Sequence, residues 1–308
     1  MSPLAEELRS ILRDPSRILE NEPMKRHTTF RIGGPADFLV QVADRQELAG
    51  VLALARRRQV PVYTLGRGSN LLVSDDGVRG IVLSLTGEFD QFTIQETRVT
   101  AGGGCDLPKL ATKVAKAGLG GLEFACAIPG TVGAGLLINA GAHGGDMSRC
   151  VASAAVVWPD GREQELSREE IGFGYRTSRL QGRDVIVVAV TFELRRADEA
   201  QLREVMRANL ERRRATQPLK YPNAGSIFKN PPGDYAGRLI EQAGLKGVRI
   251  GDAQVSEKHA NFIVNLGNAT ARDVLQLMEH VRKGVQDRFG VRLEPEVRIW
   301  GENPYFRT

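Results

Sequence analysis

The sequence predicts an α+β protein of several domains, and three observations support this prediction. Residues 45–58 place apolar side chains at positions 48, 51, 52 and 55, which is the spacing of one helix face. Strand-like runs at residues 37–42, 60–65 and 81–85 flank this helix, as in a small α/β unit. Residues 86–195 instead mix short β-like runs with one helix near 107–117. The length of 308 residues suggests roughly two or three domains.

The β-like runs of this middle region are residues 92–94, 98–101, 154–158 and 185–194. An Arg- and Glu-rich helix follows at 199–216, and then a loop at 217–232 with four prolines, so a domain boundary is expected near 210–220. The last part reads as α+β. It contains a helix at 235–243, a strand at 262–265, a long amphipathic helix from Ala271 and a strand at 296–300.

Composition and charge exclude several classes of protein. No stretch reaches the ~18–20 apolar residues of a membrane span. Met1–Arg13 is typical of a short amphipathic helix, not of a signal peptide. Three cysteines without a C-x-x-C pair argue against structural disulfides and a zinc site, and we therefore expect a cytoplasmic protein. The formal charge is 42 − 37 = +5, and the arginine triplets at 56–58 and 212–214 fit solvated helix ends better than a nucleic-acid site.

Common cofactor and catalytic motifs are missing from the sequence. Five G-x-G pairs occur, but none has a glycine three residues later, so the dinucleotide fingerprint is absent. No Gly-Lys dipeptide is present, which excludes a P-loop, and no G-x-S-x-G elbow occurs. The four histidines are far apart and lack the spacing of metal ligands, so no metal is expected.

Glycine is the unusual feature of the composition: 34 of 308 residues are glycine, about 11% against a usual ~7%. Twelve of them fall within residues 102–145, where even spacing would give about five. The excess has no G-X-Y period, so it does not indicate collagen. We expect irregular, tightly turned backbone in this stretch.

The segment at residues 63–72, YTLGRGSNLL, ends a strand directly in a glycine turn. Gly66 and Gly68 permit close backbone approach, and consecutive N–H groups can form an anion nest to which Arg67, Ser69 and Asn70 add donors. A phosphate-binding turn and a plain hairpin turn explain these residues equally well.

A second segment at residues 127–145 contains too many small residues for a packed helix and too few polar residues for a solvent loop. Such backbone can lie against an extended ligand and offer main-chain N–H groups to a pyrophosphate. The alternative is a close crossing of a helix over a strand, and the ligand interpretation is favoured over it.

These two segments together resemble the FAD-binding domain of the vanillyl-alcohol-oxidase type, and within it the family of UDP-N-acetylenolpyruvoylglucosamine reductases. The resemblance covers about residues 20–300 in order. It continues in HTTFRIGGPADFLV near the N-terminus, in GFGYRTS at 172–178, in NAGSIFKNP at 223–231, in DAQVSEKHAN at 252–261 and in LEPEVR at 293–298. Single motifs would be weak, but all of them in this order are specific.

The resemblance implies a three-domain flavoprotein with non-covalent FAD. Residues 15–85 and 86–212 would be two α/β subdomains of a PCMH-type FAD-binding module. Residues 213–300 would be an α+β substrate domain, with an N-terminal helix at 1–14 and a tail at 301–308. The implied FAD contacts are Tyr63, Leu65, Gly66, Arg67, Gly68, Ser69, Asn70, Pro129, Gly130, Thr131, Gly133, Ala134, Asn139 and Gly141.

The family reaction implies three catalytic residues. NADPH reduces FAD, and a hydride then passes to the enolpyruvyl ether of a UDP-sugar, so charge builds on the substrate carboxylate and a proton must reach the α-carbon. Arg176 would bind the carboxylate, because a guanidinium stays charged and binds it bidentately. Ser226 would donate the proton, with Lys229 or a water assisting, and Glu296 would be the third group. Without the resemblance, these would be ordinary surface, ion-pair and turn residues.

For the UDP-sugar, the implied contacts are Tyr175, Lys229, Asn230 and His259, with Arg238 as a further candidate and Lys220 and Gln254 as weaker ones. A solvated basic face would explain this set equally well. The span between Arg176 and Ser226 has no inserted capping loop, which resembles the second class of these reductases. His143 stands where many relatives have tyrosine, and we do not expect it to attach FAD covalently.

Two other functions remain as alternatives. Another FAD oxidase or dehydrogenase would keep the two glycine segments but lack the Ser226 and Glu296 motifs, so their presence argues against it. A basic nucleic-acid or protein-binding module would use the glycines only structurally, and a colourless purified protein would favour it. The reductase interpretation implies a UDP-sugar and NADPH as partners, no nucleic acid, no membrane insertion and a monomer.

Overall fold

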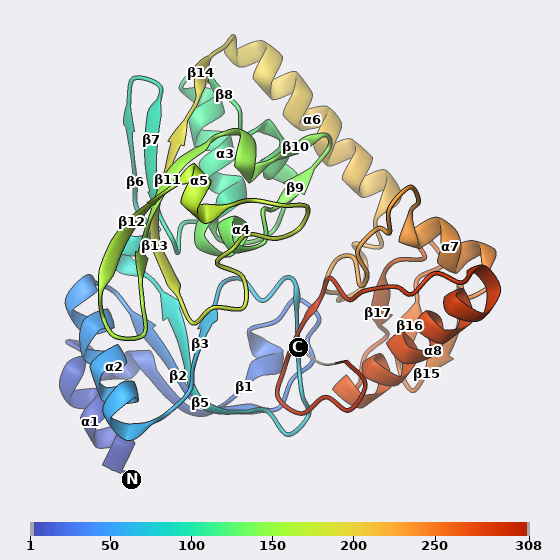
Figure 1. Ribbon diagram of the computed structural model, residues 1–308, viewed down its shortest axis with the longest axis horizontal. Helices are drawn as coiled ribbons and strands as arrows, with labels where there is room; N and C mark the ends of the chain where they lie inside the picture. The colour runs from blue at the N-terminus through green and yellow to red at the C-terminus, as the bar shows by residue number, and fades with distance from the viewer. Residues whose placement is uncertain (1–2, 307–308) are drawn as a thin grey trace. The chain divides into compact units, whose positions relative to one another are not determined.

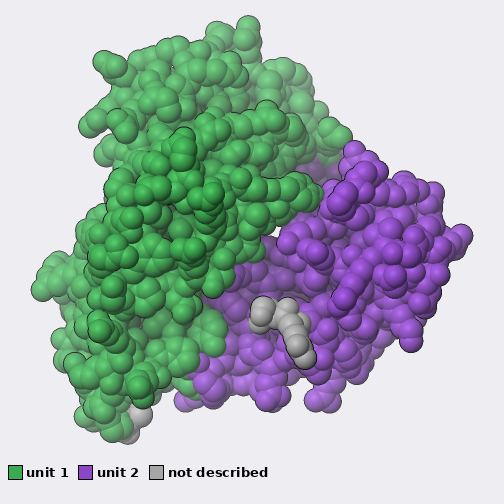
Figure 2. Space-filling view, viewed as in Figure 1, with its two compact units in different colours: residues 1–20, 37–66, 80–212 green, residues 21–36, 67–79, 213–308 purple. Residues whose placement is uncertain are grey.

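The computed structural model describes residues 3–306, so the ends of the predicted helix at 1–14 and of the predicted tail at 301–308 lie outside the described residues. The chain divides into two units (Figure 2). Unit 1 contains residues 1–20, 37–66 and 80–212, and unit 2 contains residues 21–36, 67–79 and 213–308. The predicted division of the N-terminal part at residue 85 stays a prediction.

The first sheet lies mostly in unit 1 and has the strand order β1-β2-β5-β3. Its strands are β1 (Ile18–Pro23), β2 (Pro35–Val42), β3 (Val62–Leu65) and β5 (Val78–Leu85), and β3 runs parallel to β5. Helices α1 (Pro3–Ile11) and α2 (Arg45–Arg58) lie side by side next to this sheet (Figure 1). The apolar stripe predicted for α2 is buried, because Leu48, Val51 and Leu52 join the core beneath it.

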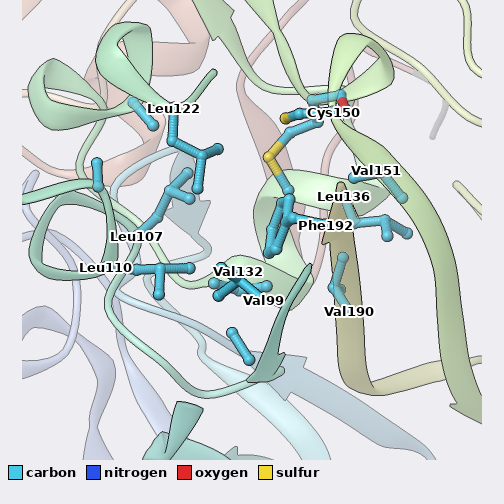
Figure 3. Close-up of a cluster of buried hydrophobic side chains, with 14 of the residues drawn as sticks. Val99, Leu107, Leu110, Leu122, Val132, Leu136, Cys150, Val151, Val190 and Phe192 are labelled. Carbon is cyan, nitrogen blue, oxygen red and sulfur yellow. Dashed lines mark hydrogen bonds between the residues drawn. The ribbon is translucent and has the colours of Figure 1, made fainter. Parts of the chain in front are cut away.

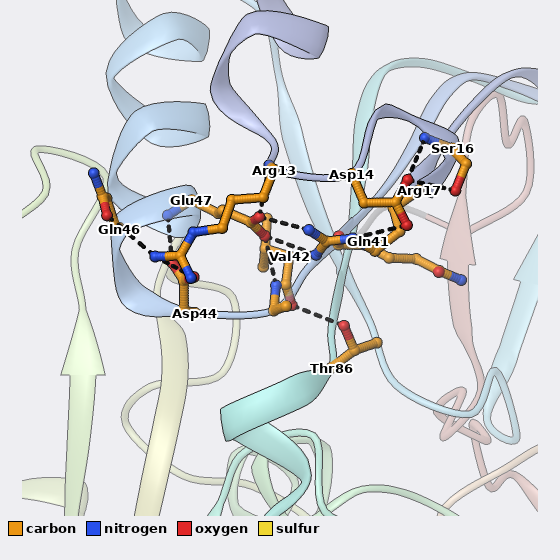
Figure 4. A network of polar contacts seen from close by, with 11 residues as sticks. Arg13, Asp14, Ser16, Arg17, Gln41, Val42, Asp44, Gln46, Glu47 and Thr86 are labelled. Carbon is orange, nitrogen blue, oxygen red and sulfur yellow. Dashed lines mark hydrogen bonds and ion pairs between the residues drawn. The ribbon is translucent and has the colours of Figure 1, made fainter.

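A buried carboxylate fastens the N-terminal segment to α2 (Figure 4). Glu47 is 2% exposed and makes a bidentate ion pair with Arg17, whose Nη1 lies 2.7 Å from Oε2. The backbone N–H groups of Ala43 and Arg13 also donate to Glu47, at 2.8 and 3.0 Å. Burial by itself raises the pKa of Glu47, but the Arg17 and backbone hydrogen bonds outweigh burial and lower the pKa to about 2.

The second sheet of unit 1 is antiparallel, in the order β12-β11-β13-β7-β6. Its strands are β6 (Phe92–Gln95), β7 (Arg98–Gly102), β11 (Val151–Val157), β12 (Glu163–Ser167) and β13 (Ile186–Glu193). Helices α3 (Leu107–Lys116) and α4 (Val132–Leu137) share a core with it, in which Leu107, Leu136 and Phe192 are fully buried (Figure 3). The short elements of this region are β8 (Leu119–Gly120), β9 (Gly141–Ala142), β10 (Gly145–Asp146), α5 (Arg168–Ile171) and β14 (Arg195–Arg196).

Helix α4 corrects the expectation that residues 127–145 contain only irregular backbone. Thr131 caps the helix, with its hydroxyl accepting a hydrogen bond from the Ala134 N–H at 3.4 Å. The helix backbone at residue 133 is in direct contact with Gly103, whose carbonyl accepts a hydrogen bond from the Gly133 N–H at 2.9 Å. Small residues leave room for this contact. A Cβ at Gly133 would lie 3.0 Å from that carbonyl oxygen. The glycines therefore serve a close backbone crossing in this segment.

Unit 2 contains a three-stranded antiparallel sheet, β15 (Arg249–Ile250), β16 (Ala253–Val255) and β17 (Ile263–Asn265). Helices α7 (Ala236–Gln242) and α8 (Ala271–Phe289) share its core, and the apolar face of α8 predicted from the sequence is buried. β4 (Leu71–Val73) pairs in parallel with β18 (Arg298–Trp300), which is shorter than the predicted strand at 296–300. Both carboxylate oxygens of Asp75 accept N–H groups at the start of α8, from Ala271 at 2.8 Å and Arg272 at 3.0 Å.

Helix α6 (Glu199–Thr216) covers the residues predicted for it, and the short 3-10 helices are at 15–17, 24–26, 87–90, 123–127 and 147–149. Cys105, Cys126 and Cys150 are buried and, within residues 3–306, form no disulfide; burial raises the pKa of Cys105 to about 11 and of Cys150 to about 12. Within residues 3–306, no His, Cys, Asp and Glu side chains gather in a group that could hold a metal ion. None of the helices described is both long and apolar enough to cross a membrane.

Candidate active site

Unit 1 brings the end of β3 against the start of α4. A Cβ at Gly66 would lie 2.9 Å from the Thr131 hydroxyl and 3.2 Å from the Ala134 methyl group, so this turn and the helix start are in close contact. Tyr63 and Leu65 precede the turn on β3. The carbonyl of Gly130 accepts the N–H of Leu107 at 3.0 Å, which fixes the segment that begins at Pro129. The turn after β3 and the start of α4, which are about 60 residues apart in the sequence, are therefore in direct contact.

The residues of this contact fit the diphosphate-bearing cofactor that the sequence predicts. Only glycine leaves room for a close approach at residue 66, and the neighbouring backbone and the Thr131 side chain provide hydrogen-bonding groups of the kind that receive phosphates. The remaining residues of the predicted turn, Arg67 to Asn70, belong to unit 2. There, Gly68 has φ +59°, and a Cβ at this position would lie 2.1 Å from the carbonyl oxygen of His27.

Arg176 lies in unit 1 at the tip of a tight turn. The Gly174 N–H donates to the Thr177 carbonyl at 2.9 Å, and Arg176 itself has φ +54°, in the left-handed region. Its guanidinium carbon lies 5.5 Å from the ring centre of Tyr175, which is 59% exposed. A Cβ at Gly141 would lie 3.2 Å from a guanidinium nitrogen of Arg176, so the arginine rests on the segment after α4. The structure thus places Arg176 beside the predicted cofactor residue Gly141.

Ser226 and Glu296 lie on neighbouring segments of unit 2. The Glu296 N–H donates to the Ile227 carbonyl at 2.8 Å, and the Lys229 N–H donates to the Glu294 carbonyl at 2.9 Å. On its other side, the Ser226 segment is bonded to Asn261, whose carbonyl accepts from the Ile227 N–H and whose side chain bonds both the N–H and the carbonyl of Phe228. Ser226 and Glu296, the two predicted proton-handling residues, therefore lie on two chain segments that pair through backbone hydrogen bonds.

Asn70 joins the same part of unit 2. Its side-chain amide donates to the Glu296 carbonyl at 3.1 Å, and its own carbonyl accepts from the Arg298 N–H at 3.1 Å. The turn at Gly225, with φ +75°, brings residue 225 to the same neighbourhood, since a Cβ there would lie 3.9 Å from the Ser69 carbonyl oxygen. The predicted FAD turn and both predicted catalytic residues of unit 2 thus form one cluster.

The predicted substrate residues of unit 2 differ in their surroundings. His259 packs edge-on against Phe262, with ring centres 4.8 Å apart, and its Nδ1 accepts the Asn261 N–H at 3.2 Å. Burial is the main cause that lowers the pKa of His259, which favours a neutral ring. The side-chain Oδ1 of Asn230 accepts the Ala236 N–H at 3.0 Å at the start of α7, and the Lys229 ammonium lies 3.5 Å from the Glu294 carboxylate.

The remaining candidates contact residues that are close to them in the sequence. Arg238 pairs with Asp234, one turn away, and also donates to Gln242. The Gln254 amide donates to the Gly247 carbonyl at 3.2 Å, and the Lys220 ammonium lies 5.6 Å from the ring centre of Tyr221. These contacts are those of a solvated polar face, the alternative that the sequence left open for this set.

Sequence reasoning missed two residues that support these segments. Asn261 is 4% exposed and supplies three of the bonds to the Ser226 segment, and Ser178 is 5% exposed and donates to the Leu137 carbonyl at 2.8 Å. Both lie inside motifs that were singled out, SEKHAN and GYRTS, but at positions to which no role was given. The sequence alone does not show that these two polar residues are buried, and their burial is what indicates a supporting role.

Comparisons with known proteins match most of this chain. Residues 36–167 match the family model of the FAD binding domain, and residues 217–300 match that of the C-terminal domain of UDP-N-acetylenolpyruvoylglucosamine reductase. A reductase of this name from Symbiobacterium thermophilum is 68% identical over 306 residues, 99% of each chain. Another from Anoxybacillus flavithermus is 50% identical over 302 residues, 98% of this chain and 99% of the relative.

A solved structure supports the same assignment. The crystal structure of UDP-N-acetylenolpyruvylglucosamine reductase (MurB) from Thermus caldophilus matches with a TM-score of 0.80 and 41% identity, covering 91% of this chain and 98% of that one. The fold and the match to the FAD binding domain define this chain as an FAD-dependent oxidoreductase of mixed α+β architecture. It belongs to the family of UDP-N-acetylenolpyruvoylglucosamine reductases, so the family and the fold class predicted from the sequence are confirmed.

Proposed function

We propose that this chain uses NADPH to reduce UDP-N-acetyl-enolpyruvylglucosamine to UDP-N-acetylmuramate, a step in the synthesis of peptidoglycan precursors. Relatives that match nearly the whole chain have the name of this reductase, and the FAD binding domain model matches residues 36–167. The observation in the molecule that supports it most strongly is the backbone pairing of the Ser226 segment with Glu296. FAD, when bound, supplies the redox centre between NADPH and the enol ether.

The residues of the chain would divide the remaining chemistry. Arg176 would bind the carboxylate of the enolpyruvyl group, because a guanidinium remains charged and offers two parallel donors. This interaction strengthens as negative charge builds on the carboxylate during hydride transfer. Ser226 would donate the proton to the α-carbon, and Glu296 would be the third group that stabilises the enolate or supplies a proton. Tyr175, Lys229, Asn230 and His259 would bind the remainder of the UDP-sugar.

The cofactor set of Tyr63 to Asn70 with residues 129–141 would bind FAD non-covalently. Residues 15–85 and 86–212 would form its two subdomains, and residues 213–300 would form the substrate domain. We also propose that the protein acts in the cytoplasm, because its substrates are a charged nucleotide sugar and a soluble nicotinamide. We further propose that it is a monomer.

The test separates the two half-reactions under anaerobic conditions. NADPH should bleach the flavin absorbance of the purified protein, and the enolpyruvyl UDP-sugar should restore it. A flavin that NADPH reduces but this sugar leaves reduced would remove the reductase assignment and keep a general oxidoreductase. A protein without flavin absorbance would remove both.

Two variants test the catalytic residues of unit 2. Ser226→Ala should leave reduction by NADPH nearly unchanged and slow reoxidation by the sugar ~10²-fold or more, the range for loss of a general acid. Glu296→Gln should act in the same half-reaction. Glu294→Gln is the matched control, because Glu294 is on the same segment, two residues away, with its side chain 74% exposed. Equal slowing of both half-reactions by Ser226→Ala would contradict the role of Ser226.

A further inference from the structure

The turn that presents Arg176 is in an unfavourable backbone conformation. Arg176 has φ +54°, which residues other than glycine, asparagine and aspartate rarely adopt. Within the turn, the backbone groups of Gly174 and Thr177 bond each other at 2.9 and 3.4 Å, which are short-range contacts. Such a conformation persists only where the surroundings enforce it. The contacts on either side of Arg176 therefore determine where its guanidinium lies.

Asn139 supplies one of these contacts. Its side chain is 6% exposed, and both of its amide atoms are used. Nδ2 donates to the Gly174 carbonyl at 2.9 Å, and Oδ1 accepts the Ser148 N–H at 2.9 Å. Asn139 itself has φ +44°, a conformation that asparagine tolerates better than most residues. The side chain thus joins the Arg176 turn to the 3-10 helix at 147–149 that follows β10.

Ser178 supplies the second contact, on the other side of Arg176. Its hydroxyl is buried and donates to the carbonyl of Leu137, the last residue of α4, at 2.8 Å. Leu137 and Asn139 are two residues apart, so both bonds attach the turn to the C-terminal end of one short helix. Gly141 then leaves the space in which the guanidinium lies, since a Cβ there would be 3.2 Å from it.

We infer that Asn139 and Ser178 are positioning residues that fix Arg176 for the substrate carboxylate. The inference rests on the proposed function of Arg176 and adds to it. It gives the side chain of Asn139, which the sequence grouped with the FAD contacts, a task toward the substrate. Because α4 begins at the Gly66 contact and ends at these two bonds, six helical residues link the predicted cofactor surface to the arginine.

Asn139→Asp tests the bond to the turn. Aspartate keeps the acceptor for the Ser148 N–H and tolerates positive φ, but as a carboxylate it has no donor for the Gly174 carbonyl. Reoxidation of the reduced flavin by the sugar should slow about tenfold, the order expected for one lost hydrogen bond. FAD content and reduction by NADPH should change less than about twofold on the same reasoning. Ser178→Ala should act in the same direction, and it replaces Asn139→Asp if that variant does not fold.

A double-mutant cycle with Arg176→Ala separates positioning from general support. Arg176→Ala alone should slow reoxidation by the sugar roughly 10²-fold, as for loss of one transition-state donor. If Asn139 acts through Arg176, adding Asn139→Asp to Arg176→Ala should cost less than about twofold more. Ser148→Ala is the matched control. It removes a hydroxyl bonded to Asp146 but keeps the backbone N–H that Asn139 accepts, so it should behave as the parent.

The outcomes distinguish the two proposals. If Arg176→Ala reoxidises at the parental rate, the proposed role of Arg176 fails and the positioning role with it. If Arg176→Ala is slow but Asn139→Asp and Ser178→Ala equal the parent, or slow the reaction equally in both backgrounds, only the positioning inference is overturned. Loss of FAD from Asn139→Asp would also overturn it, because the side chain would then be a cofactor contact.

Discussion

The two units hold their predicted catalytic residues in different ways. In unit 1, Arg176 is on a turn that two side chains, Asn139 and Ser178, fasten to the end of α4. In unit 2, the Ser226 segment lies between two neighbours and is bonded on both sides, largely through backbone groups. A segment with partners on two sides tolerates the loss of one bond, whereas a turn with few attachments does not. We therefore expect the Arg176 turn to be the more easily displaced of the two.

The units also differ in the chemistry of their buried polar groups. Unit 1 buries the carboxylate of Glu47 against Arg17, and unit 2 buries the neutral amides of Asn261 and Asn265. An amide keeps the same hydrogen bonds at every pH at which the chain is folded, but a carboxylate loses its ion pair when it is protonated. The difference predicts that acid acts on unit 1 through Glu47, and that unit 2 has no counterpart in these amides.

The largest effect is expected at Asn261. Asn261→Ala leaves the buried N–H and carbonyl of Phe228 without their partners, which should lower the free energy of unfolding of unit 2 by about 2–4 kcal/mol. Asn261→Asp keeps the acceptor for the N–H and should cost less. The measurement is urea unfolding followed by the fluorescence of Trp300, in a Trp158→Phe background that leaves one tryptophan. An unchanged unfolding midpoint for Asn261→Ala would show that backbone pairing alone holds the Ser226 segment.

A comparable effect, dependent on pH, is expected at Glu47. Its pKa lies at about 2 in the folded chain against an ordinary value of 4.5, so its contribution is complete above about pH 4.5 and is lost as the pH falls toward 2. At 1.36 kcal/mol per pKa unit this contribution is at most about 3 kcal/mol. Glu47→Gln should therefore destabilise unit 1 at pH 7 and much less near pH 3.

The fluorescence of Trp158 in a Trp300→Phe background reports this unfolding from unit 1. The same Glu47→Gln change read through Trp300, with Trp158 replaced, is the control. A difference between Glu47→Gln and its parent that stays constant from pH 7 to pH 3 would contradict the low pKa of Glu47. Such a result would show that Glu47→Gln destabilises the chain through a change in packing and not through the loss of charge.

Much of the fold follows from local signals in the sequence. Helix α2 is found at the predicted residues 45–58, because Asp44 caps its start and its apolar spacing matches the buried face. Helix α8 begins at Ala271 as predicted, since Thr270 and Asp273 form a capping box there. Helix α4 was missed because its small residues give no apolar period. The reason that it forms is a close backbone contact with Gly103, which no local pattern records.

The sequence names the residues of the candidate site but not the contacts that support them. Arg176, Ser226 and Glu296 follow from motifs, and their roles remain proposals. The parallel pairing of β4 with β18 joins residues more than 220 apart, so the contact of Asn70 with the Glu296 carbonyl has no local signal. Asn139 shows the limit most clearly. The family resemblance implied a cofactor contact there, and only its burial and two bond partners indicate a different task for its side chain.

The smallest effect is expected at the ion pair between Lys229 and Glu294. The two charged groups are 3.5 Å apart, but the Glu294 side chain is 74% exposed, and exposed pairs contribute about 0–1 kcal/mol. The backbone bond from the Lys229 N–H to the Glu294 carbonyl does not depend on the side chain. Glu294→Gln should therefore shift the unfolding midpoint of unit 2 far less than Asn261→Ala. An equal shift would mean that charge, and not backbone pairing with its buried amides, holds the Ser226 segment, and the contrast between the two units would fail.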